Sequence, residues 1–101
     1  TQIESKILDD PENVGVRVEL ADLLWTKGDK KAALSEYEIA RNIDPKNLKV
    51  LMGLASLNAS EDVKNYNKAF EYINEILKID PNYEDAIDLQ KEVEERRQTL
   101  L

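Results

Sequence analysis

The stretch ALSEYEIARNIDP, from Ala33 to Pro45, decides the fold because a second version of it runs from Ala69 to Pro81. Both versions begin with alanine, end with Ile-Asp-Pro and carry large apolar residues at matching places between. A third Asp-Pro pair, at Pro11, ends a poorer copy, so the three prolines are 34 and 36 residues apart. A period in this range is typical of a solenoid built from stacked helix pairs.

Between the prolines, apolar residues recur at the spacing of an amphipathic helix. The pattern predicts helices at about residues 1–10, 14–27, 30–43, 48–59, 66–79 and 83–101. Val14, Val16 and Val18 alternate as in a strand, but helical spacing resumes at Leu20 and an isolated strand would have no partner. The sequence therefore predicts an all-α fold.

Turn residues separate the predicted helices at regular places. Asn13 and Asp29 each precede an apolar helical pattern and are suited to cap the helix. Pro45 and Asn47 form a similar boundary before the next helix. Gly28 follows the second helix, where a left-handed residue is usual. Because only a two- or three-residue turn then separates two helices, we expect them to be antiparallel neighbours.

The composition bounds the class of protein. The 101 residues include 14 basic and 21 acidic side chains, a net charge of −7, with 42% hydrophobic and 35% charged residues. These are the proportions of a soluble helical domain. An acidic surface without a basic stripe repels a phosphate backbone, so nucleic acid is not expected as a partner. No apolar run approaches the roughly 20 residues of a spanning helix, so we expect no membrane insertion.

The domain organisation follows the repeat. We expect a single domain over residues 1–101, in which 1–10 end a preceding repeat, 11–45 and 46–81 are repeats, and 82–101 form a capping helix. The second repeat has a two-residue insertion in the linker of residues 60–65. The chain starts at Thr1, inside the end of a repeat, and we therefore expect it to be a piece of a longer protein. Nothing in the sequence fixes the compartment, for which the cytoplasm is only the default.

These residues resemble the tetratricopeptide repeat, whose pattern is W-x2-L-G-x2-Y, then A-x3-F, then P. The corresponding places are Arg17, Leu20, Ala21, Leu24, Ala33, Tyr37 and Pro45 in the first unit, and Leu51, Leu54, Ala55, Asn58, Ala69, Ile73 and Pro81 in the second. The alanines are the informative matches, because helices approach closely only where side chains are short. Arg17 in place of an aromatic residue, and Asn58 in an apolar place, depart from the pattern.

The resemblance implies a right-handed superhelix of helical hairpins that acts as a noncatalytic protein-interaction module. Family members bind a peptide or protein segment in a concave groove lined by the first helix of each unit. After Pro81 the corresponding places read Ile87, Gln90, Lys91 and Glu94, so the pattern is lost there. A polar final helix of this kind is what a terminal repeat requires.

The groove-facing positions follow from the repeat period and helical spacing. We predict that the partner contacts Val18, Asp22, Trp25, Lys49, Met52, Ser56, Ala59, Asp88 and Glu92. This surface is apolar at its first unit, small and neutral at its second and acidic on the last helix. We therefore expect a ligand with an apolar or aromatic anchor near Val18, Trp25 and Met52, and with Lys or Arg toward the last helix. The alternative for Trp25 is a core position beneath the first short helix.

The sequence lacks the residues that most catalytic and metal sites use. It has no cysteine and no histidine, which removes the commonest nucleophile, general base and metal ligands. The acidic cluster Asp80, Asn82, Glu84 and Asp85 lacks the glycine and the spacing of a calcium loop. We therefore expect no enzymatic activity and no catalytic, cofactor or metal site.

A second function remains open from the sequence. The apolar edge formed by Ile3, Ile7 and Leu8 would be uncovered in a chain of about two repeats. Such an edge could recruit a second copy of the chain or an upstream unit of the longer protein, so self-association within a larger protein is the alternative to peptide binding.

Overall fold

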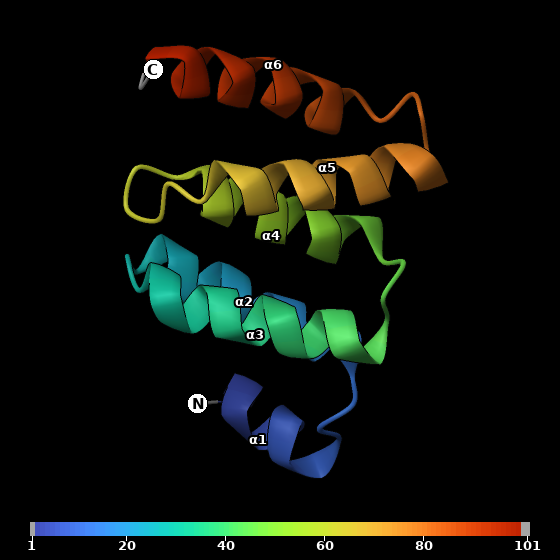
Figure 1. The fold of residues 1–101 in the computed structure, drawn as a ribbon. Helices are drawn as coiled ribbons and strands as arrows, with labels where there is room; N and C mark the ends of the chain where they lie inside the picture. The colour runs from blue at the N-terminus through green and yellow to red at the C-terminus, as the bar shows by residue number, and fades with distance from the viewer. Residues whose placement is uncertain (1, 100–101) are drawn as a thin grey trace. The chain divides into compact units, whose positions relative to one another are not determined.

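The computed structural model describes residues 2–99, and the predicted all-helical fold is confirmed: this part of the chain contains α-helices and no strand (Figure 1). The helices in this part are α1 (Gln2–Asp9), α2 (Val14–Thr26), α3 (Lys30–Ile43), α4 (Leu48–Ala59), α5 (Tyr66–Ile79) and α6 (Glu84–Thr99). Residues 1, 100 and 101, which the sequence placed in the first and last helices, lie outside the described residues. The chain divides into two compact units, and the boundary between them in the sequence falls within α4, between Val50 and Leu51. The single-domain organisation and its boundaries stay predictions.

In the first unit, α2 and α3 pack against each other as a hairpin (Figure 1). The turn between them closes with Gly28 N–H donating to the Trp25 carbonyl and Asp29 N–H donating to the Leu24 carbonyl, both at 2.9 Å. This pattern requires a left-handed residue, and Gly28 has φ of 89°. Asp29 then accepts a hydrogen bond from the Ala32 amide at 3.2 Å and caps α3. The predicted turn is confirmed.

The hairpin is held together by small residues around one aromatic ring. Ala21 of α2 and Ala33 and Ala40 of α3 are fully buried, which lets the two helix backbones approach closely. Tyr37 fills the space that remains and is 2% exposed. The short helix α1 packs against α2, whose first turn is capped by the side chain of Asn13 as predicted.

The second unit begins within α4 and contains the two-residue insertion of the repeat. Asn58 at the end of α4 is buried, and its Nδ2 donates to the Leu54 carbonyl at 2.8 Å, so the polar residue in an apolar place satisfies its donor within its own helix. The backbone carbonyl of Asn58 accepts a hydrogen bond from the backbone N–H of Asn65 at 2.8 Å. Lys64, in the linker between, has φ of 51°, a left-handed conformation without glycine.

The helices α5 and α6 pack together and bury Ile73, Ile76, Ala86 and Val93. The guanidinium of Arg97 lies 4.8 Å from the centre of the Phe70 ring, a cation–π contact between the two helices. The face of α6 opposite Ala86 and Val93 is polar and exposed; that α6 is a capping helix stays a prediction.

Candidate interaction site

In the first unit, three residues of α2 line an open hollow of about 400 Å³, namely Asp22, Trp25 and Thr26. They share one face of the helix because they are three and four residues apart. Thr26 Oγ1 donates to the Asp22 carbonyl at 2.9 Å, which holds the hydroxyl against the helix. The hollow therefore combines a carboxylate, an indole ring and a hydroxyl.

Tyr37 of α3 contacts both Asp22 and Trp25. Its hydroxyl donates a hydrogen bond to Asp22 Oδ1. Its ring meets the Trp25 ring edge to face, with centroids 6.3 Å apart and planes at 89°. Burial, then the hydrogen bond to Asp22 and the negative charge of that carboxylate, raise the pKa of Tyr37 above its usual range, so the phenol keeps its proton. One buried residue thus orients the carboxylate and the indole together.

The sequence is compatible with Trp25 either in the binding groove or in the core, and in the structure Trp25 has features of both positions. The ring packs against Tyr37, yet it is only half-buried and lines the hollow. The neighbouring predicted contact Val18 is 6% exposed and packs in the hairpin core. It sits there because α2 buries the side that carries Val18 and Ala21, so Val18 offers a partner little surface. Lys49, near the end of this unit, is exposed.

In the second unit, the predicted contacts on α4 differ in exposure. Met52 and Ser56 are half-buried and available in part, whereas Ala59 is 1% exposed. The Ala59 carbonyl accepts a hydrogen bond from Arg96 Nη1 of α6 at 2.9 Å. Ala59 therefore contributes to the attachment of the last helix and shows almost no side-chain surface.

The predicted acidic contacts on α6 are both exposed but differ in pairing. Glu92 Oε1 accepts from Arg96 Nη2 at 2.7 Å, a pair one helical turn apart. Asp88 is exposed without such a partner among residues 2–99. Sequence reasoning missed Arg96, although the spacing of four residues between Glu92 and Arg96 was a usable signal.

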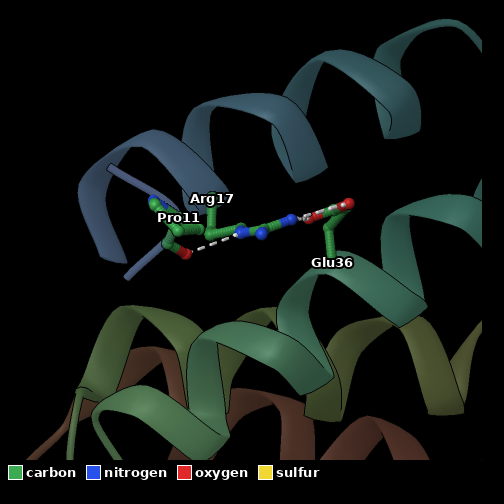
Figure 2. A network of polar contacts seen from close by, with 3 residues as sticks. All are labelled: Pro11, Arg17 and Glu36. Carbon is green, nitrogen blue, oxygen red and sulfur yellow. Dashed lines mark hydrogen bonds and ion pairs between the residues drawn. The ribbon is translucent and has the colours of Figure 1, made fainter. Parts of the chain in front are cut away.

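Arg17, which replaces the usual aromatic residue of the repeat pattern, forms a polar network that Figure 2 shows. Its Nη1 lies 3.0 Å from Oε2 of Glu36 in α3, and its Nε donates to the Pro11 carbonyl at 3.2 Å. The guanidinium thereby joins α2 to α3 and to the turn after α1. This ion pair supports the scaffold and was not foreseen from the sequence.

The turn before α6 forms a second open hollow, of about 340 Å³, lined by Asp80, Asn82, Tyr83, Glu84 and Asp85. Asp80 Oδ1 accepts from the Asn82 amide at 3.1 Å, as is usual in turns. Throughout residues 2–99, no three His, Cys, Asp or Glu side chains are grouped so that they could hold a metal ion. Within the same residues, no helix combines the length and the apolar character needed to cross a bilayer.

Two adjacent segments match the profile of one protein family. Residues 14–47 and 50–83 each match the tetratricopeptide repeat, and together they make up more than half of the chain. The chain belongs to the tetratricopeptide repeat family. The first matched repeat contains the α2–α3 hairpin and the second contains α4 and α5, and this membership supports a role as a protein-interaction module.

A solved tetratricopeptide repeat structure has a similar fold. It is described as the crystal structure of YrrB, a tetratricopeptide repeat protein with an unusual peptide-binding site. The TM-score is 0.78 and the sequence identity 19%, over 88% of this chain and 45% of that one. At this identity the likeness shows the fold alone, and the chain spans less than half the length of that protein. No curated protein matches the chain.

Proposed function

We propose that this chain is a noncatalytic adaptor module that binds a peptide or protein segment through the hollow of α2 and the exposed positions of α4 and α6. The observation that carries the proposal is the set of Asp22, Trp25 and Thr26 around an open hollow, with two of these side chains oriented by the buried Tyr37. A side chain held in this way loses little conformational freedom on binding, which favours recognition.

The proposed contacts are the nine residues predicted from the sequence, with different roles. Those with exposed or half-exposed side chains contact the partner directly, namely Asp22, Trp25, Lys49, Met52, Ser56, Asp88 and Glu92. The buried Val18 and Ala59 act indirectly, because they fix the helices that present the others. The YrrB structure, which is described as having an unusual peptide-binding site, is compatible with this proposal.

The proposal is tested by selecting ligands from a random-peptide display library with the purified chain as bait. Selected peptides are then titrated by calorimetry against wild type, Trp25→Leu and two exposed-surface controls, Glu19→Gln of α2 and Glu38→Gln of α3. We expect Trp25→Leu to weaken binding at least tenfold, since aromatic anchors dominate such interfaces, and the controls to bind as wild type does. If no peptide is enriched, or if Trp25→Leu binds normally, the proposed site is wrong.

A specific observation also favours self-association as a second function. Leu8 of α1 is 84% exposed, and Ile79 at the end of α5 is 43% exposed. Exposed apolar side chains of this size are candidates for contacts between copies. Sedimentation equilibrium of wild type and Leu8→Ser over a range of concentrations tests this. A dimer that Leu8→Ser abolishes supports the function, and a monomer at all concentrations excludes it.

A further inference from the structure

The hollow on α2 has a chemistry that selects its occupant. Its polar wall is the carboxylate of Asp22, and its apolar wall is the indole of Trp25 one helical turn away. We infer that it takes a basic side chain of the partner, with arginine preferred to lysine. This inference rests on the proposed function and names the ligand chemistry of the same site.

Among the residues that the structure describes, the Asp22 carboxylate has no counter-ion. Within residues 2–99, the side chain that hydrogen-bonds to the Asp22 carboxylate is Tyr37, whose neutral hydroxyl donates to Oδ1. No Lys or Arg side chain pairs with Asp22 within residues 2–99, and the Asp22 side chain is exposed at the hollow. An apolar occupant would remove water from this charge without replacing the lost hydrogen bonds, which is unfavourable. A cation restores both the charge balance and the hydrogen bonds.

The indole favours a planar cation. Tyr37 meets the Trp25 ring edge to face at 89°, and Trp25 is only half-buried and contributes to the wall of the hollow. Tryptophan is the best aromatic partner for a cation, and a guanidinium can stack on the ring while its N–H groups reach a carboxylate. An ammonium group is a compact, strongly hydrated charge and gains less from the ring. The Arg97–Phe70 contact shows that this chain already pairs arginine with an aromatic ring.

The volume of the hollow and the net charge of the chain both agree with a basic side chain as the occupant. The hollow of about 400 Å³ is near the small end of ligand pockets, which are roughly 300–1,000 Å³, and suits one side chain better than a folded element. The net charge of −7 also draws a basic segment toward the chain. The sequence had placed the partner's basic residues near α6 and an apolar anchor near Trp25, whereas the hollow points to a basic residue at Trp25 itself.

The test uses three small probes that differ in the charge or in the shape of the side-chain end group. N-acetyl-arginine amide, N-acetyl-citrulline amide and N-acetyl-lysine amide, the last with a free side-chain amine, are titrated into the 15N-labelled chain, and the Trp25 indole N–H resonance is followed by NMR. Citrulline matches arginine in shape but is neutral. We expect arginine amide to shift the Trp25 resonance with saturation, lysine amide to bind several-fold more weakly, and citrulline amide to bind at least tenfold more weakly.

A matched pair of variants identifies the carboxylate. Asp22→Asn keeps an oxygen that can accept from Tyr37 but removes the charge, and we expect it to weaken arginine amide about tenfold or more. Glu19→Gln removes an exposed carboxylate from the same helix and should leave the affinity unchanged. The dispersion of the amide spectrum shows whether each variant is folded. Equal binding of arginine and citrulline amides, or normal binding by a folded Asp22→Asn, would overturn the inference.

The selected peptides separate this inference from the proposed function. If they bind at Trp25 but lose nothing when each arginine is replaced by citrulline, the interaction module stands and the basic occupant is wrong. If the arginine probe saturates the Trp25 shift and Asp22→Asn weakens it, the occupant is supported even where a selection yields no peptide. If no probe and no peptide moves the Trp25 resonance, both proposals fail.

Discussion

Replacing Arg17 by methionine tests how the scaffold tolerates a charged residue where the repeat pattern has an aromatic one. The Arg17 and Glu36 side chains are 15% and 17% exposed, and the guanidinium lies 3.0 Å and 3.4 Å from the two carboxylate oxygens of Glu36. The pair is thus largely shielded from solvent but not fully buried. The hydrogen bond from Arg17 to the Pro11 carbonyl is exposed to solvent, so water can replace it.

These geometries set the expected magnitude. An exposed ion pair contributes about 0–1 kcal/mol, and breaking a buried one by removing a single partner costs about 3–5 kcal/mol. Because this pair lies between those limits, Arg17→Met should cost about 2 kcal/mol of unfolding free energy and leave Glu36 unpaired. Glu36→Leu should cost about the same, for the corresponding reason. The double variant should cost less than the sum by about 1–2 kcal/mol, since it leaves no unpaired charge.

The assay is urea unfolding of the wild type, both single variants and the double variant, with unchanged m-values as the sign that the transition is comparable. The double-mutant cycle isolates the coupling between the two side chains. If the two single-variant costs add up to the double-variant cost within about 0.3–0.5 kcal/mol, Arg17 and Glu36 are not coupled, because independent sites add to that precision.

Four other perturbations have definite expected outcomes. Gly28→Ala should cost about 1 kcal/mol in urea unfolding, because φ is 89° and an added Cβ meets nothing within 4 Å, so the cost is conformational; wild-type stability would contradict this. Lys64→Gly should have the opposite sign, up to about 1 kcal/mol, because Lys64 has φ of 51°; destabilisation would show that another feature of the linker dominates. The raised pKa of Tyr37 contributes stability that is present below about pH 10 and lost as the pH rises toward the folded-state pKa, because the unfolded phenol loses its proton first. The wild type should therefore lose stability above pH 10 faster than Tyr37→Phe, by up to about 1.4 kcal/mol per pH unit, and parallel profiles would contradict this. Arg96→Met should speed amide hydrogen exchange in α6 relative to α5, because the bond to the Ala59 carbonyl at 2.9 Å is lost; equal protection would assign the attachment to apolar packing alone.

The helices and their ends could be predicted because local chemistry determines them. Asn13 and Asp29 cap with their own side chains, and Gly28 supplies the left-handed turn, all within a few residues of the backbone groups they satisfy. The buried alanines Ala33 and Ala69 were also predictable, since their place in the repeat requires short side chains. These features need only sequence spacing and the repeat period.

The site could be predicted only in part because it depends on contacts between helices. Which residue of α3 meets Asp22 and Trp25 follows from the register of the hairpin, and nothing local to Tyr37 shows it. The exposure of Val18 was misjudged for a related reason. Apolar residues lie around most of α2, so their spacing does not choose the buried side. The pairing of Arg17 with Glu36 likewise joins residues 19 apart among many charges.

The most direct test of peptide binding at the α2 hollow is the fluorescence of Trp25, the single tryptophan of the chain, during titration with a selected peptide. We predict that the free chain has an emission that a neutral quencher reduces, because the half-buried Trp25 lines an open hollow. Addition of the peptide should change the emission with saturation and protect the ring from the quencher. A peptide that binds by calorimetry while Trp25 emission and quenching stay unchanged would exclude the α2 hollow as the binding site, since the interaction surface would then lie elsewhere on the chain.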